Sequence, residues 1–304
     1  MPVVSVGNLT LGGTGKTPMV LWIARWLRKR GVRLTLISRG YGVQEGARND
    51  EALELEDQLP DVPHLQNPDR VEAARSAVEQ LACQLILLDD AFQHRRIYRD
   101  LDIVLLDATE PFGYGHVFPR GMMREPPKAL ARADVVALSR ADMVNESRRE
   151  ALRRQVERFA GDALWLEMFH KPRALLRADG TEATIDRLTG CKVAAFCGIG
   201  NPLGFRHTLA SCGCDVVAFQ EFPDHHAYEA EDLLRITQWV NGRNDVAAIV
   251  CTHKDLVKIG AARLGTRPLW ALAVGMEIIA GQAELEAKLA GLVERVSRTD
   301  RLVS

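Results

Sequence analysis

A glycine-rich turn between a strand and a helix constrains this chain more than any other segment. The turn reads Thr10-Leu11-Gly12-Gly13-Thr14-Gly15-Lys16-Thr17. It follows the apolar run Val3 to Val6 and precedes a helical pattern that Pro18 opens. Glycines allow such a backbone to wrap an anion with its N–H groups, and the N-terminus of the next helix adds partial positive charge. The segment therefore predicts a polyphosphate site on an α/β sheet.

Two residues of this turn carry the expected chemistry. Lys16 is expected to reach the β and γ phosphates of a nucleotide, and the Thr17 hydroxyl to bind the Mg²⁺ that bridges them. The usual motif begins with glycine where this chain has Thr10, and Gly12 and Gly13 supply the flexibility instead. The alternative is a glycine turn with a chance Lys-Thr pair, and the flanking strand and helix favour nucleotide binding.

Two acidic residues close a continuous apolar strand further along the chain. The apolar run covers Gln84 to Leu88, and Asp89 and Asp90 follow it directly. In P-loop proteins a carboxylate at such a strand end lies beside the Mg²⁺ of the nucleotide. A strand-end acid that caps the next turn is the other interpretation, and the presence of the P-loop favours the metal role.

Arginines are also expected at this edge of the sheet. Arg39 follows the apolar run Val32 to Ile37, and Arg124 lies in the glycine- and proline-rich loop from Pro111 to Pro127. Ligands of α/β proteins bind at the carboxyl ends of the strands. Both guanidinium groups are therefore expected to face phosphate.

The alternation of apolar strands with amphipathic helices predicts an α/β protein with a largely parallel sheet flanked by helices. The chain has 304 residues, enough for two lobes. We expect a P-loop lobe over residues 1–162, a β-ribbon linker over 163–190 and a smaller α/β lobe over 191–304. Residues 43–69 are expected to form a long acidic loop, and the tail from Leu285 to Val296 an amphipathic core helix.

Charge and hydropathy exclude some classes of partner. The net charge is -1, so the chain lacks the overall excess of basic residues that is typical of nucleic-acid-binding proteins, and no nucleic-acid partner is expected. No apolar run approaches the roughly 18 residues of a membrane-spanning helix, so the chain as given is expected to contain no transmembrane segment.

Two motifs of the second half leave alternatives open. Asp224-His225-His226 could bind a metal, but adjacent side chains diverge and no further ligand stands at zinc spacing. A catalytic or structural role on a loop is therefore favoured for these histidines. Thr252-His253-Lys254-Asp255 follows an apolar strand and is similar to a base-reading loop of P-loop GTPases, although the residue usual between Lys and Asp is missing.

Taken together, five motifs in order resemble the tetraacyldisaccharide 4'-kinases, which phosphorylate the lipid A disaccharide precursor. The motifs are Val4-Ser5-Val6-Gly7-Asn8-Leu9-Thr10 leading into the P-loop, Ser38-Arg39-Gly40-Tyr41-Gly42, Asp89-Asp90-Ala91-Phe92-Gln93-His94-Arg95, Arg124-Glu125-Pro126 and Asp224-His225-His226. The resemblance covers nearly the whole chain. It implies ATP and Mg²⁺ on the P-loop and a sugar acceptor between two lobes.

The resemblance also implies roles for individual residues. Asp50, hydrogen-bonded to His225, would take the proton from the sugar hydroxyl. Asp89 and Asp90 would organise the metal, with Glu125 as an additional metal contact. The implied catalytic set is thus Asp50, His225, Lys16, Asp89 and Asp90, and the implied metal set Thr17, Asp89, Asp90 and Glu125. The acceptor and phosphate side would comprise Arg39, Tyr41, Gln93, His94 and Arg124.

Family resemblance further implies a lipid-linked disaccharide substrate and a peripheral place on the cytoplasmic face of the inner membrane, with no protein partner. The hydrophobic N-terminal helix of the family is not seen ahead of the first strand, so either the start is truncated or membrane contact comes from elsewhere. The candidates are Trp22, Trp26, Phe112, Phe118, Met122 and Met123. The alternative function is a P-loop GTPase of the metallochaperone or switch type.

Overall fold

The computed structural model describes residues 1–40, 50–224 and 226–303 of the chain. Two compact units are present, and each is described by itself. Unit 1 comprises Met1–Phe169 and Met276–Ser304, and unit 2 comprises His170–Gly275.

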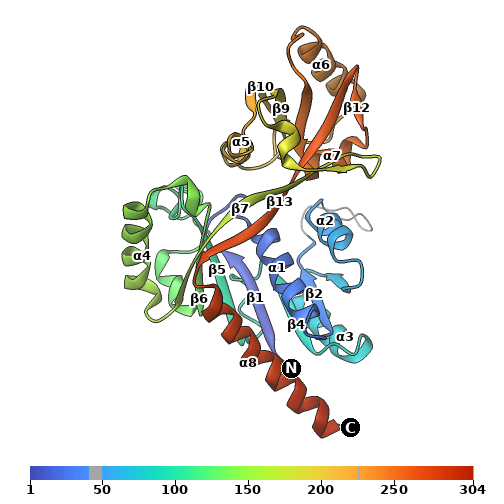
Figure 1. The fold of residues 1–304 in the computed structure, drawn as a ribbon. Coiled ribbons are helices and arrows are strands. Elements are labelled where there is room, and N and C mark those ends of the chain that lie inside the picture. The colour runs from blue at the N-terminus through green and yellow to red at the C-terminus, as the bar shows by residue number, and fades with distance from the viewer. Residues whose placement is uncertain (41–49, 225, 304) are drawn as a thin grey trace. The chain divides into compact units, whose positions relative to one another are not determined.

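Unit 1 is built on a parallel sheet with the strand order β3-β2-β4-β1-β5-β6-β7 (Figure 1). Its strands are β1 (Val3–Asn8), β2 (Leu34–Ser38), β3 (His64–Gln66), β4 (Leu85–Asp89), β5 (Leu101–Asp107), β6 (Val135–Ser139) and β7 (Leu164–Leu176). The central strands are buried along their whole length, which is why they read as continuous apolar runs. A parallel sheet brings the ends of β1, β4, β5 and β6 to one edge.

Helices cover both faces of this sheet. They are α1 (Lys16–Arg28), α2 (Asp50–Gln58), α3 (Arg70–Gln80), α4 (Glu146–Ala160) and α8 (Gln282–Val303), with short 3₁₀ helices η1 (Gly113–Gly115), η2 (Pro127–Arg132) and η3 (Ala141–Met143). One core cluster joins α1, α2 and α8 to the sheet. A second cluster packs α3 against the sheet. A third packs α4 and η2 against the sheet. The expected tail helix is confirmed, since Leu285 and Leu289 are fully buried.

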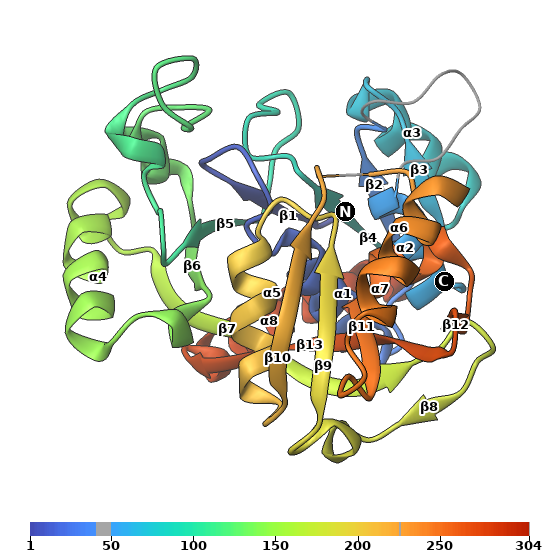
Figure 2. The same cartoon turned by 90° about the horizontal axis from the view of Figure 1, so that it is seen from above.

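Unit 2 repeats this layered plan on a smaller scale. The strands β10 (Asp215–Glu221), β9 (Lys192–Cys197), β11 (Ala248–Thr252) and β13 (Arg267–Ala280) lie side by side and parallel. The remaining elements are β8 (Glu182–Ala183), η4 (Ile185–Leu188), α5 (Pro202–Ser211), α6 (Ala230–Asn241), α7 (His253–Ile259) and β12 (Arg263–Leu264). Figure 2 shows α5 on one side of β9 and β11, with α6 and α7 on the other.

Two long strands carry the chain between the units. It leaves unit 1 along β7 and returns along β13, and these strands are neighbours in the strand order. The predicted class, a largely parallel α/β sheet with a second smaller α/β part joined by a β-ribbon, is confirmed. The bounds of the compact units differ from those of the expected lobes, because residues 276–304 return to unit 1, where Leu285 and Leu289 pack into its core.

One expectation about residues 43–69 is wrong. This stretch is not a loop throughout, because it contains α2 and β3. Ala52 and Leu55 of α2, and Leu59 directly after it, are each 1% exposed and stand at helical spacing, so this segment has an apolar side despite its many acids.

Candidate active site

The glycine-rich turn connects β1 to α1 at the carboxyl edge of the unit 1 sheet. Gly12 and Gly15 have φ angles of 97° and 87°, in the left-handed region where only glycine is unstrained. Asn8 Nδ2 donates to Thr14 Oγ1 at 3.0 Å and to the Gly12 carbonyl at 3.4 Å. The turn is therefore tied to the last residue of β1, and α1 begins at Lys16 immediately after it.

A second loop lies against this turn through the backbone. The Leu11 N–H donates to the Met122 carbonyl at 2.7 Å, and the Arg124 N–H donates to the Leu9 carbonyl at 2.7 Å. These bonds fix the main chain of Arg124 beside the P-loop. Arg124 therefore lies at the edge of the sheet that carries the P-loop, and its expected contact with phosphate stays a prediction.

Asp90 is the centre of the charged side chains in this region. Arg124 Nη1 lies 2.8 Å from Asp90 Oδ1 and 2.9 Å from Oδ2, and Lys16 Nζ lies 3.5 Å from Oδ1. The backbone of Asp90 is left-handed, with φ at 49°, and its carbonyl accepts from Arg70 Nη2 at 2.8 Å. Three cations thus surround one acidic residue at the end of β4.

The pKa of Asp90 records this environment. Burial acts to raise the pKa, but the charges of Lys16, Arg124 and Arg70 and the Arg124 hydrogen bond outweigh it and hold the pKa below its ordinary value. Burial lowers the pKa of Arg70, and the neighbouring Arg39 acts in the same direction. Arg39 therefore lies close enough to this cluster to contribute its charge.

The turn after Asp90 packs closely against β1. A Cβ atom on Gly7 would lie 2.6 Å from Phe92 Cβ and 2.7 Å from Phe92 N, so only glycine fits there. Gln93 Nε2 donates to the Asn8 carbonyl at 3.0 Å. This packing holds residues 91–94 against the strand that feeds the P-loop.

His94 stands at the end of that turn, among several cations. Burial lowers the pKa of His94, and the cations Arg70, Arg96 and Arg99 lower it further. Within the part of the chain that the structure describes, its buried Nε2 atom has no hydrogen-bonding partner. An imidazole nitrogen without a protein partner can form one hydrogen bond to a ligand.

The oxygen donors expected to hold Mg²⁺ are only partly assembled here. Thr17 is the second residue of α1, and Asp89 is the last residue of β4, where it lies in register with Val6 of β1. Glu125 instead pairs with Arg132, with Glu125 Oε2 2.8 Å from Arg132 Nη2. Among the described residues no group of three or more His, Cys, Asp or Glu side chains could hold a metal. Mg²⁺ beside a nucleotide takes only one or two carboxylates, so Thr17 with Asp89 or Asp90 suits it.

Three predicted residues cannot be placed. Tyr41 and His225 lie outside the described residues, as does the side chain of Asp50, whose backbone begins α2. The expected Asp50–His225 pair stays a prediction.

The GTPase-like motif of unit 2 has a structural role. Asp255 is fully buried, and its carboxylate accepts from Tyr228 Oη at 2.9 Å, from Gly198 N at 3.1 Å and from Thr252 Oγ1 at 2.6 Å. Burial raises the pKa of Asp255 even though these hydrogen bonds act to lower it. A carboxylate occupied in this way caps α7 and does not read a base. His226 likewise bonds Asp232, with Nε2 2.9 Å from Oδ2.

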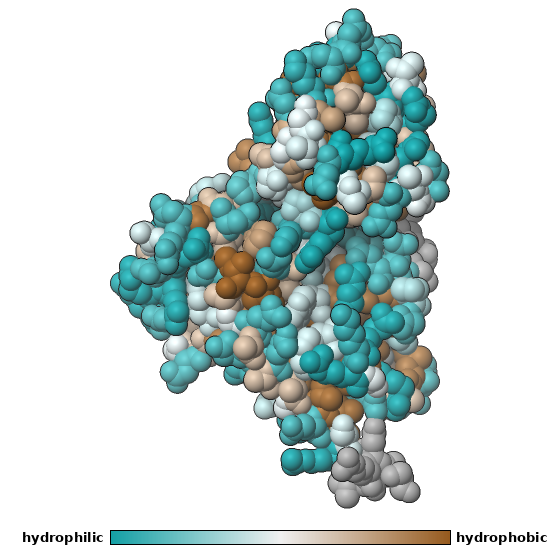
Figure 3. Space-filling view, viewed as in Figure 1, coloured by the Kyte–Doolittle hydropathy of each residue, from teal (hydrophilic) through white to brown (hydrophobic). Residues whose placement is uncertain are grey.

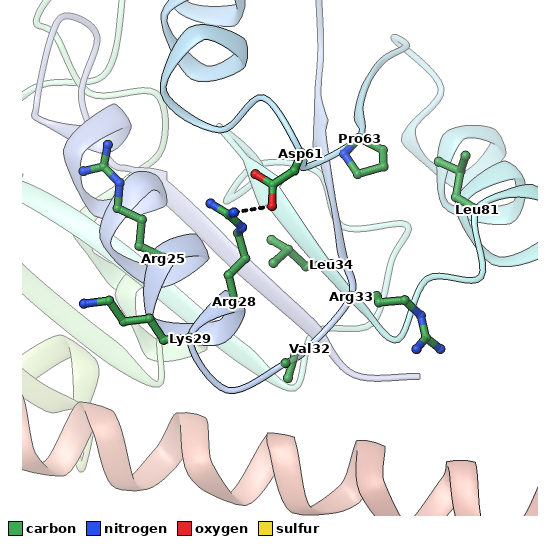
Figure 4. A pocket seen from close by; sticks show the side chains of 10 residues that line it. Arg25, Arg28, Lys29, Val32, Arg33, Leu34, Asp61, Pro63 and Leu81 are labelled. Carbon is green, nitrogen blue, oxygen red and sulfur yellow. Dashed lines mark hydrogen bonds and ion pairs between the residues drawn. The ribbon is translucent and has the colours of Figure 1, made fainter.

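A cavity of about 580 Å³ lies at the other edge of the unit 1 sheet (Figure 4). Its lining includes Arg25, Arg28, Lys29 and Arg33, and Figure 4 shows Arg28 paired with Asp61. The cavity sits where α1 ends and β2 begins. Because the P-loop lies where α1 starts, this cavity is separate from the candidate phosphate site.

Hydrophobic side chains are exposed beside the P-loop rather than on α1. Trp26, Phe112 and Met123 are buried, so these three expected membrane contacts are covered by the protein, and Trp22 is partly buried against the core. Phe118 and Met122 are 63% and 38% exposed. On the face seen in Figure 3, hydrophobic residues form separate patches among hydrophilic ones. Across the described ranges, no helix combines the length and apolarity needed to cross a bilayer.

Sequence reasoning missed three polar residues of this edge. Asn8 holds the turn, Arg70 holds the Asp90 carbonyl, and Arg140 Nη2 donates to the Gly13 carbonyl at 2.6 Å. Arg140 follows β6 directly, so the rule that ligand-facing residues stand at strand ends would have found it. Arg70 begins a helix far along the chain, and no local pattern marks it.

Comparisons with known proteins agree with this geometry. A family model described as tetraacyldisaccharide-1-P 4'-kinase matches residues 1–294. A tetraacyldisaccharide 4'-kinase of Anaeromyxobacter dehalogenans (strain 2CP-C) is 43% identical over 309 residues, covering 95% of this chain and 81% of that protein. One from Syntrophus aciditrophicus (strain SB) is 39% identical over 300 residues, covering 91% and 80%. The crystal structure of LpxK from Aquifex aeolicus in complex with ATP is similar with a TM-score of 0.71 and 29% identity, covering 97% of this chain and 88% of that one.

Proposed function

The chain belongs to the tetraacyldisaccharide-1-phosphate 4'-kinase family, and we propose that residues 10–17 hold the ATP from which it transfers a phosphoryl group. The protein is a kinase of lipid A biosynthesis, and its acceptor is the 4'-hydroxyl of a lipid-linked disaccharide. The GTPase alternative is not favoured, because Asp255 is committed to its buried hydrogen bonds.

The observation that carries the site assignment is the cluster of Lys16, Arg124 and Asp90 at the mouth of the glycine-rich turn. Phosphoryl transfer requires mainly positioning and neutralisation of charge on the phosphate oxygens. In this proposal the N–H groups of the turn and α1 hold the β and γ phosphates. Lys16 supplies a point charge to them, and Arg124 supplies a planar fork of donors.

Mg²⁺ is proposed as the metal of this site. Thr17 and Asp89 would hold it, with Asp90 ordering its surroundings, and the bound ion would neutralise charge that develops on the phosphates. In this proposal Glu125 keeps its ion pair with Arg132 and does not bind the metal. Its role as a metal ligand stays a prediction from the family resemblance.

A carboxylate from α2 is proposed to receive the proton of the acceptor hydroxyl. Asp50 would accept the proton and His225 would orient its carboxylate, as the resemblance implies. Arg39, Tyr41, Gln93 and His94 are proposed to face the disaccharide. Support for Gln93 and His94 comes from the turn that packs Gln93 against Asn8 and leaves His94 Nε2 without a hydrogen-bonding partner among the described residues.

Peripheral contact with the cytoplasmic face of the inner membrane is proposed through the loop beside the P-loop. Tyr114, Val117, Phe118 and Met122 are exposed on one short segment whose backbone is bonded to the glycine-rich turn. Apolar side chains on such a loop can enter the interface of a bilayer or meet the acyl chains of a lipid substrate. This arrangement would bring lipid and ATP to the same edge of unit 1.

The site assignment is tested by transfer from radiolabelled ATP to lipid A disaccharide 1-phosphate. The expected result is a labelled lipid with the wild type, and none with Lys16→Ala. Lys29→Ala, an exposed lysine at the far end of α1, is the matched control and should keep full transfer. Asp50→Ala should bind ATP and lose transfer. Wild-type transfer by Lys16→Ala would overturn the assignment.

A further inference from the structure

A buried arginine joins two strand ends to the glycine-rich turn. Arg140 is 7% exposed, follows the last residue of β6 and has a left-handed backbone with φ at 52°. Its Nη1 forms an ion pair with Asp107, the last residue of β5, and its Nη2 donates to the Gly13 carbonyl at 2.6 Å. One guanidinium therefore bridges β5, β6 and the P-loop.

Side chains rather than packing at the glycines hold this part of the turn. A Cβ atom placed on Gly12 or Gly13 would meet no atom within 4 Å, so packing does not fix their conformation. Asn8 Nδ2 donates to Thr14 Oγ1 at 3.0 Å and to the Gly12 carbonyl at 3.4 Å. The 2.6 Å bond from Arg140 is the shortest of these three tethers, and it ends on the Gly13 carbonyl that lies between them.

The other end of the tether is itself anchored. Asp107 Oδ1 accepts from Thr109 N at 3.0 Å and from Thr109 Oγ1 at 2.7 Å, so the carboxylate cannot swing freely. Burial acts to lower the pKa of Arg140 and Asp107 opposes this, and an arginine stays protonated throughout the physiological range. The charge of Arg140 is balanced locally by Asp107, so its effect on the turn is geometric.

We propose that Arg140 is a positioning residue for nucleotide binding, acting by fixing the peptide between Gly13 and Thr14. A trans peptide points its C=O and N–H in opposite directions. Holding the Gly13 carbonyl on Arg140 therefore directs the Thr14 N–H away from β6. Arg140 touches the turn and not the reacting atoms, so it acts through the shape of the phosphate cradle.

Substitutions of Arg140 test this role by their effect on nucleotide affinity. Arg140→Lys keeps a cation near Asp107 but lacks the rigid fork needed to serve both partners. The expected result is an ATP Kd and an ATP KM raised about tenfold, since hydrogen bonds of charged groups contribute on that scale. The KM for the lipid acceptor should stay within about twofold. Arg140→Met should raise the ATP Kd at least as much.

Arg149→Met is the matched control. Arg149 pairs with Glu167 at 2.9 Å and donates to the Val144 carbonyl at 2.9 Å, so it supports the same segment after β6 without touching Gly13. Its loss should lower thermal stability and leave the ATP Kd unchanged. An equal rise in ATP Kd for both variants, or no rise for Arg140→Lys, overturns the proposal. If Arg140→Met does not fold, Arg140→Lys carries the comparison.

This inference rests on the proposed ATP site, and Lys16→Ala separates the two. Normal ATP binding by Lys16→Ala would mean that the site itself is wrong. Loss of binding by Lys16→Ala with an unchanged Kd for Arg140→Lys would leave the site in place and reject only the role of Arg140.

Discussion

Arg124 Nη1 contacts both carboxylate oxygens of Asp90, at 2.8 Å and 2.9 Å. The same carboxylate lies 3.5 Å from Lys16 Nζ. A phosphate that binds Lys16 and Arg124 must share these cations with Asp90. The position of Asp90 therefore links the P-loop to the loop that carries Arg124.

Asp90→Asn should separate nucleotide binding from transfer. The change removes a negative charge that faces the phosphates, so the ATP Kd should stay the same or decrease. The turnover number should fall by about 100-fold or more, because a group that orders the charges of the transition state is lost. Titration calorimetry and the lipid transfer assay measure the two quantities. Asp100→Asn, at an acid that pairs with Arg295 away from the P-loop, should retain turnover. Wild-type turnover by Asp90→Asn would contradict the role.

The protein should lose stability as the pH is lowered, because of the titration of His94. The folded protein lowers the pKa of His94 from 6.5, so as pH falls below this value the unfolded chain gains a proton that the folded chain does not. The free energy of unfolding therefore decreases in that range, and His94 contributes nothing to the slope well above it. Thermal unfolding at pH 7.5 and 5.5 measures the decline, which should be smaller for His94→Gln. Identical declines for the two proteins would refute this reasoning.

Gly7→Ala should destabilise unit 1. The new methyl group would lie 2.6 Å from Phe92 Cβ and 2.7 Å from Phe92 N, and overpacking of this kind costs about 1–3 kcal/mol. The residues after Asp90 would also shift, so transfer activity should fall. Denaturant unfolding provides the measurement. Gly291→Ala in α8 meets no neighbouring atom and should instead add about 0.5–1 kcal/mol, and equal effects at both positions would argue against the steric explanation.

The exposed loop beside the P-loop should mediate membrane contact. Phe118→Ser with Met122→Ser should reduce sedimentation of the protein with vesicles of anionic phospholipid, because less apolar surface enters the interface. Val78→Ser on α3, where Val78 is 51% exposed, is the control and should bind vesicles like the wild type. Unchanged binding by the double variant would assign the contact to another surface.

The nucleotide turn and the acidic strand end could be predicted from the sequence because each is a local pattern. Residues 10–17 need only the flanking strand and helix, and Asp89 and Asp90 need only the apolar run before them. The parallel sheet then brings both to one edge without further information.

What the sequence could not provide depends on contacts between distant segments. Arg140 reaches the turn across 127 positions, and Arg70 reaches the Asp90 carbonyl across 20. Arg140 is marked in the sequence only by its place directly after β6, and Arg70 has no periodic or spaced signature. Helix α2 did have one in Ala52, Leu55 and Leu59, but the surrounding acids suggested a loop. The proposed Asp50–His225 pair came only from family resemblance, and its side chains are outside the described residues.

The return of β13 and α8 to unit 1 has a consequence for biosynthesis. Leu285, Leu289 and Leu292 belong to the same core as the strand that feeds the P-loop, yet they follow the whole of unit 2 in the sequence. Unit 2, which is continuous from residue 170 to 275, is translated in full before that core can close. Residues 1–169 therefore leave part of their core uncovered until α8 has been synthesised, and this apolar surface stays open to aggregation while unit 2 is being made.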